Sequence, residues 1–138
     1  MDDAFYYLAL IADRNGDAER ALRFYSQVQK GENVLPALLR AATLLHTHGA
    51  ASAADELLDR LIEDEPQRAP EILTARARMY AQSSELPKAF AVLEKGALEY
   101  PDSVELHYAT ASVYEEQGRV SAALADSTFR AAVKVAAH

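Results

Sequence analysis

Three stretches of 17 residues decide the fold: ALIADRNGDAERALRFY at 9–25, ATLLHTHGAASAADELL at 42–58 and ARMYAQSSELPKAFAVL at 77–93. Each opens on alanine, has glycine or serine at its eighth position, a second alanine at its thirteenth and a bulky residue at its seventeenth. A more degenerate fourth copy begins at Ala111 and has Gly118 and Ala123 at the matching positions. Successive copies are 33, 35 and 34 residues apart, a period typical of stacked helical units.

Columns outside the quoted stretches repeat with the same spacing. A large residue stands four positions before the first alanine in three copies, and a polar one replaces it in the fourth: Phe5, Leu38, Leu73 and His107. A bulky residue follows the first alanine by three positions at Leu45, Tyr80 and Tyr114. Prolines close the second and third copies, at Pro66 and Pro101. The agreement of independent columns establishes the repeat.

The combined pattern, small-x-x-bulky-x-x-x-Gly-x-x-x-x-Ala-x-x-x-bulky ending near proline, resembles the tetratricopeptide repeat. The resemblance covers about residues 2–134. It implies an all-α fold, a right-handed α-solenoid of four helix-turn-helix units with about eight helices. The chain is then a single domain over 1–138, with repeats at about 2–34, 35–68, 69–102 and 103–138.

Local signals place the helices of these units. The expected helices are 3–15 and 17–30, 34–48 and 51–64, 69–82 and 85–99, and a fourth pair after Pro101. Turns are expected at Gly16, Gly49, Ser84 and Gly118. Asp17 is a predicted N-cap, and capping boxes are predicted for Ser52 with Asp55 and for Asp102 with Glu105. The recurrent alanines are expected where paired helices cross, because a methyl group permits close approach.

The fourth repeat departs from the pattern. Counted from Gly118, Ser127 and Arg130 stand where bulky and small residues belong, whereas Ala125, Phe129 and Ala132 fit two positions later. The sequence thus predicts a two-residue insertion, either in the turn after Gly118 or near Ser127 and Thr128. The last helix carries few charges, although terminal repeats normally have a polar outer face. We therefore expect a further repeat or another chain to cover it.

Composition excludes several classes of protein. The formal charge is −7, which argues against nucleic acid, because phosphate backbones are bound mainly by lysine and arginine. There is no cysteine, so sulfur usage leaves the compartment open between cytoplasm and periplasm. No apolar run approaches the roughly 20 residues of a membrane span, so we expect no membrane insertion.

The sequence offers little catalytic chemistry. His46 and His48 are two positions apart, which turns them to different sides of a helix, and they cannot share a metal as an i, i+4 pair does. Neither a nucleophile elbow nor a phosphate-binding glycine loop is present. The prediction is a chain that is not an enzyme and has no cofactor and no metal site.

The resemblance also implies where a partner binds. In the tetratricopeptide family the first helix of each pair lines a concave groove that holds a peptide or protein segment. Carried onto this sequence, that face includes Asp13 and the following residues: Tyr6, Leu10, Arg40, Thr43, His46, Arg78, Gln82, Tyr108, Ser112 and Glu115. Its tyrosines suit apolar side chains, and its arginines suit carboxylates. The lysine–asparagine clamp of some family members is absent, since Tyr6 and Leu10 occupy its first two positions.

Two functions remain open at this point. One is an adaptor that binds a protein or peptide in the groove. The other is an architectural segment that stacks on further repeats or self-associates through its C-terminal helix. The run over 5–12, followed by the run over 21–28, also resembles interior portions of long proteobacterial tetratricopeptide proteins, some of which are envelope lipoproteins. That resemblance implies that the chain is part of a longer array, with a periplasmic location as one option.

Overall fold

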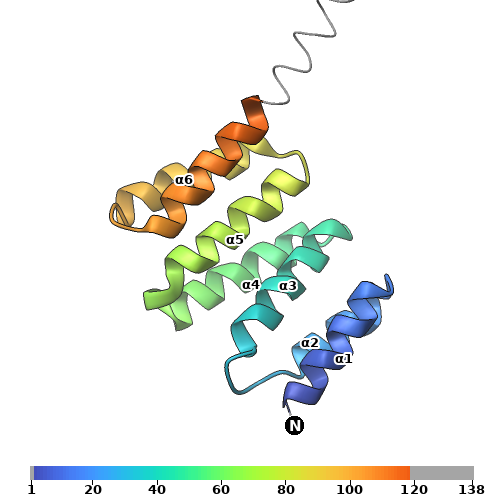
Figure 1. The fold of residues 1–138 in the computed structure, drawn as a ribbon. Helices are drawn as coiled ribbons and strands as arrows, with labels where there is room; N and C mark the ends of the chain where they lie inside the picture. Colours follow the sequence, from blue (N-terminus) through green and yellow to red (C-terminus); the bar gives the residue numbers. More distant parts are fainter. Residues whose placement is uncertain (1, 119–138) are drawn as a thin grey trace, which may run out of the picture. The chain divides into compact units, whose positions relative to one another are not determined.

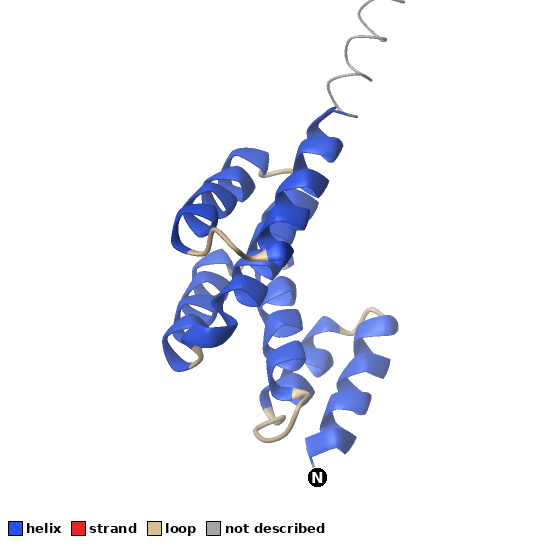
Figure 2. Cartoon of the chain, turned by 60° about the vertical axis from the view of Figure 1, so that its left-hand side comes forward, coloured by secondary structure: helices blue, strands red, loops and turns tan. Residues whose placement is uncertain are grey.

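The computed structural model describes residues 2–118, and every regular element in that range is helical (Figure 2), which confirms the predicted all-α class. The elements are α1 (Asp2–Arg14), α2 (Ala18–Ser26), α3 (Val34–Thr47), α4 (Ala51–Asp64), the 3-10 turn η1 (Pro66–Arg68), α5 (Ala69–Gln82) and α6 (Leu86–Glu99). Residues 104–118 form a further helix. None of the helices in this described range is both long and apolar enough to cross a membrane.

The chain divides into two compact units, Met1–Ala75 and Arg76–His138. In the first unit α1 packs on α2 and α3 packs on α4, as two helix pairs (Figure 1). The second helix of the first pair, α2, also packs on the first helix of the next pair, α3. The second unit contains the end of α5, α6 and the helix at 104–118.

Three of the four predicted turns are built in the same way. Gly16, Gly49 and Ser84 have left-handed backbones, with φ of 79°, 89° and 62°. In each turn the next residue donates its N–H to a carbonyl five positions earlier, at 2.8 to 2.9 Å, which is the long bond of a Schellman motif. The fourth prediction is wrong, because Gly118 is helical and has no left-handed φ.

Helix caps agree with the sequence only in part. Asp17 caps α2 as predicted, and its Oδ1 accepts the Arg20 N–H at 3.1 Å. The predicted box at Ser52 is wrong, because α4 begins at Ala51 and no side chain caps it. The cap predicted at Asp102 lies one residue later, where Ser103 Oγ accepts the Leu106 N–H at 3.2 Å.

Helix α2 is shorter than the predicted 17–30. It ends at Ser26, where the N–H groups of Gln27 and Val28 bond to carbonyls three residues back, both at 3.1 Å. Such short bonds tighten and terminate the last helical turn. Val28 nevertheless stays in the core, with 2% of its surface exposed.

The alanine columns form the core of the first three repeats. The first-helix alanines are 0 to 1% exposed at Ala9, Ala42 and Ala77, and the second-helix alanines are fully buried at Ala21, Ala54 and Ala89. The bulky residues of the second helices are also 0 to 1% exposed: Tyr25, Leu58 and Leu93. Each of these three helix pairs therefore buries both of its repeated alanines and the repeated bulky residue of its second helix.

The fourth repeat differs in its described part. Ala111 is exposed, and Tyr114, which packs against Phe90 with ring centroids 4.7 Å apart, is 55% exposed. Ala109 and Val113 are the buried residues instead, at 1% and 4%. The residues predicted to pack on Ala111, including Ala123 and the two-residue insertion, lie outside the described residues.

Two buried columns were not recognised in the sequence. One stands two positions after the first alanine, and its members in repeats two to four are 3 to 6% exposed: Leu44, Met79 and Val113. The other stands five positions before it, with 0 to 1% exposure: Ala37, Ile72 and Leu106. Both columns are apolar in the first repeat too, at Ile11 and Ala4, so the repeat spacing would have revealed them.

Candidate interaction surfaces on the first helices

The first unit carries half of the residues predicted to bind a partner. Tyr6 and Leu10 lie on α1, and Arg40, Thr43 and His46 lie on α3. Leu10 is 37% exposed and the Arg40 side chain 46% exposed, whereas the other three are half-buried. This surface is therefore accessible mainly at one leucine and one arginine.

Tyr6 contributes to the core as well as to the surface. Its ring lies 6.3 Å from the Tyr25 ring and 5.7 Å from the Tyr7 ring, measured between centroids. It packs on the buried cluster that includes Ala9 and Ala21. Removal of this ring would change helix packing together with any binding surface.

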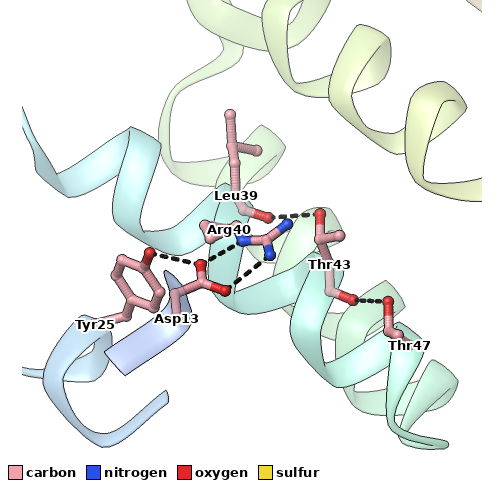
Figure 3. A network of polar contacts seen from close by, with 6 residues as sticks. All are labelled: Asp13, Tyr25, Leu39, Arg40, Thr43 and Thr47. Atoms are coloured by element: carbon pink, nitrogen blue, oxygen red, sulfur yellow. Dashed lines mark hydrogen bonds and ion pairs between the residues drawn. The ribbon is translucent and has the colours of Figure 1, made fainter. Parts of the chain in front are cut away.

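Arg40 is held by a carboxylate of the preceding repeat (Figure 3). Its Nη2 donates to Asp13 Oδ1 at 2.8 Å and its Nε donates to Asp13 Oδ2 at 2.5 Å, which forms a bidentate ion pair between α3 and α1. The hydroxyl of the fully buried Tyr25 donates to the same Oδ2 at 2.9 Å. One carboxylate thus joins α1, α2 and α3, and the structure brings Tyr6 and Arg40 together through Tyr25 and Asp13.

The electrostatics of this network follow from its geometry. The hydrogen bonds from Arg40 lower the pKa of Asp13, although burial opposes them in part. Burial, reinforced by Asp13, raises the pKa of Tyr25, and the carboxylate raises the pKa of Arg40. All three groups keep their ordinary charge at neutral pH. Asp13 balances the charge of Arg40, so Arg40 is first of all a link between repeats and not an unengaged anchor for a partner's carboxylate.

The threonines of α3 satisfy their own hydroxyl groups. Thr43 Oγ1 donates to the Leu39 carbonyl at 3.1 Å, and Thr47 Oγ1 donates to the Thr43 carbonyl at 2.8 Å (Figure 3). Bonds of this kind to a carbonyl four residues earlier are usual for threonine within helices. Thr43 remains able to accept a hydrogen bond from a partner.

The second unit carries the other half of the predicted residues. Arg78 and Gln82 are exposed on α5, and Tyr108 is 67% exposed on the helix at 104–118. On that helix Glu115 is exposed and Ser112 is half-buried. This unit therefore presents a cation and an accessible aromatic ring.

The histidines have structural positions. His48 is the exposed C-cap residue of α3, and His46, two positions earlier in the last turn of that helix, is half-buried. His107, the polar residue that replaces the large one of its column, is exposed, with Nε2 2.7 Å from the Pro101 carbonyl oxygen. Within residues 2–118 no three His, Asp or Glu side chains gather closely enough to hold a metal ion.

The sequence placed Asp13 on the inner face but did not pair it with Arg40. The two residues are 27 positions apart, which is not the repeat period, so no column reports them. The available signal was two opposite charges on successive first helices, and it does not specify how those helices are rotated.

Comparisons with known proteins agree with the helix-pair architecture. Residues 3–30, which contain α1 and α2, match the family model of the tetratricopeptide repeat. Over 117 residues, or 85% of the chain, the sequence is 28% identical to a TPR repeat-containing protein of Pseudomonas aeruginosa. The chain spans 20% of the length of that curated relative.

Proposed function

We propose that this chain, which is a tetratricopeptide repeat protein, binds a peptide or protein segment on the inner faces of its first helices. Tetratricopeptide repeats imply a role in protein interaction or as a repeat scaffold, and members of the family are typically not enzymes. The relative in Pseudomonas aeruginosa supports a bacterial origin.

The observation that carries the proposal is the exposure of Tyr108. Two-thirds of its surface, 67%, is accessible, whereas its neighbours Leu106 and Ala109 on the same helix are 1% exposed. A tyrosine that contributes so little to the core is well suited to bind a partner, since it offers a rigid apolar ring with a polar tip.

The chemistry of the partner follows from the exposed side chains at the predicted inner-face positions of the second unit. Arg78 is an exposed guanidinium and favours a carboxylate on the partner. Tyr108, which lies in the same unit as Arg78, favours apolar side chains. We propose a segment that combines apolar residues with at least one acidic residue.

The test uses the full chain as bait for proteins from an extract of the source bacterium. Tyr108→Ala and Arg78→Glu should each reduce capture of the same protein at least about tenfold, because losses of about 1.4 kcal/mol are usual for anchor residues. The matched control is Leu98→Ala, because Leu98 is 85% exposed but lies on the second helix α6.

The variants distinguish the outcomes. Capture that survives both inner-face substitutions, or that Leu98→Ala reduces equally, contradicts the proposal. Arg40→Glu is unsuitable, because it would place a carboxylate against Asp13 and disrupt the link between α1 and α3.

A further inference from the structure

One face of α1 is apolar and uncovered. Ile11 is 58% exposed, Leu8 is 43% exposed and Ala4 is exposed. These residues are spaced by four and three positions, so they lie along one side of the helix. We call Ala4, Leu8 and Ile11 the end face of α1.

The same three positions are covered one repeat later. A shift of 33 residues carries the end face onto Ala37, Ala41 and Leu44 of α3, which are 0%, 6% and 6% exposed. These residues belong to one buried cluster with Ala21 and Tyr25 of α2 and with Val28, which follows that helix. Since α2 packs directly on α3, the second helix of the first pair covers this face of the next pair.

The later repeats follow the same rule at the two outer positions of the face. Ile72 and Met79 in the third repeat and Leu106 and Val113 in the fourth are all 0 to 4% exposed. Among the described repeats only the first exposes both positions. Its residue at the later position is Ile11, which is as apolar as any of its counterparts.

We propose that the end face of α1 docks the second helix of another helix pair of the same repeat type, located N-terminal to α1 in the same polypeptide. The proposal extends the α2–α3 interface by one repeat and concerns a different face from the inner one. The expected helix has a small residue and a bulky one four positions later, and an apolar residue follows the bulky one by three positions, as Ala21, Tyr25 and Val28 do.

Two observations favour this occupant over a second copy of the chain. Each described second helix already buries its own apolar residues, including Tyr25 at 0%, Leu58 at 1% and Leu93 at 1%, so a second copy could offer none of them without unfolding. In addition, the chain spans 20% of the curated relative with which it aligns, so a related repeat-containing chain extends well beyond the length of this one.

The experiment supplies the missing helix. Residues 1–33 are duplicated in front of residue 1, which keeps the 33-residue period and places a copy of α2 before α1. The thermal midpoint of the downstream repeats should rise by roughly 4 °C or more, as expected when an exposed apolar face becomes covered. Slower amide exchange at residues 8–11 of the downstream copy should accompany the rise.

Charge substitutions identify the face responsible. Ile11→Glu in the downstream copy should abolish the gain, and in the unduplicated chain it should shift the midpoint little, because surface substitutions are usually tolerated. Leu98→Glu in the duplicated chain is the control and should preserve the gain, because Leu98 is 85% exposed on α6.

Each other result overturns the proposal. A duplicated chain without added stability or protection shows that this face does not accept a second helix. A gain that survives Ile11→Glu places the contact elsewhere. If the unduplicated chain sediments as a dimer that Ile11→Glu converts to monomer, the occupant is a second copy.

Discussion

Helices α1 and α3 are the same element of two successive repeats, yet they differ in what covers them. Leu44 of α3 is 6% exposed, whereas Ile11 at the equivalent position of α1 is 58% exposed. Ala37 is fully buried and its counterpart Ala4 is exposed. In a linear array the burial of a residue depends on the neighbouring repeat as much as on its own side chain.

The largest expected effect is at the covered position. Leu44→Ala should lower the free energy of unfolding of the first unit by about 2–5 kcal/mol, because it removes buried methyl groups and leaves a cavity between α2 and α3. Urea denaturation followed by circular dichroism measures this cost. A cost below about 1 kcal/mol would contradict the difference between the two helices, since α3 would then not be tightly covered.

Overpacking gives the next effect and compares two alanines one repeat apart. Ala37→Phe should destabilise the first unit by about 1–3 kcal/mol, because its position has no space for a ring. Ala4→Phe should change stability by less than about 0.5 kcal/mol, because Ala4 is exposed. Equal costs for the two variants in thermal melts would contradict the difference in coverage between the two positions.

The polar link between α1 and α3, formed by Asp13, Tyr25 and Arg40, also contributes to stability. Asp13→Ala should cost about 1–3 kcal/mol at pH 7, because the buried Tyr25 hydroxyl and the Arg40 guanidinium both lose their acceptor. The side chains are partly exposed, so Coulomb attraction adds little to that figure. A double-mutant cycle with Arg40→Met isolates the pair, and zero coupling energy would contradict the bidentate geometry.

The same network predicts a pH dependence. Arg40 holds the pKa of Asp13 below its ordinary value of 3.8, so the unfolded chain takes up this proton at a higher pH than the folded chain. The stabilisation is complete above that ordinary value and is lost as pH falls through the folded pKa. The stability difference between the wild type and Asp13→Asn should therefore shrink in acid, and a constant difference from pH 7 to pH 2 would exclude the ion pair as its source.

A smaller effect concerns the start of α2, the helix that covers α3. Asp17→Ala should cost about 1 kcal/mol, because the Arg20 N–H loses its acceptor. Ser52→Ala should cost less than about 0.5 kcal/mol, because Ser52 does not cap α4. A larger cost for Ser52→Ala than for Asp17→Ala in chemical denaturation would show that Ser52 does cap α4.

The repeated columns were predictable because every copy restates them. Ala21, Ala54 and Ala89 report the same helix crossing three times, and the bounds of α4 and α5 follow from the neighbouring turn and proline signals. The buried columns that contain Leu44 and Ala37 recur with the same spacing, so the sequence could have predicted them too, although they were not recognised.

Other features depend on geometry that the spacing does not encode. The Asp13–Arg40 pair needs a specific rotation of α1 relative to α3, and two opposite charges 27 residues apart do not specify one. The cap at Ser103 rather than Asp102 reflects a one-residue shift between two residues that are both good N-caps. Gly118 stands at the expected turn position but is helical, without the left-handed φ of Gly16 and Gly49.

The most direct test of the account compares the exposed and the covered members of one column in the chain as it stands. Ile11→Ala and Leu44→Ala are measured side by side by urea denaturation at pH 7. We expect Ile11→Ala to change the free energy of unfolding by less than about 1 kcal/mol, while Leu44→Ala lowers it by about 2–5 kcal/mol. Equal costs for the two substitutions would contradict the claim that a neighbouring second helix covers this face of α3 and that none covers the end face of α1.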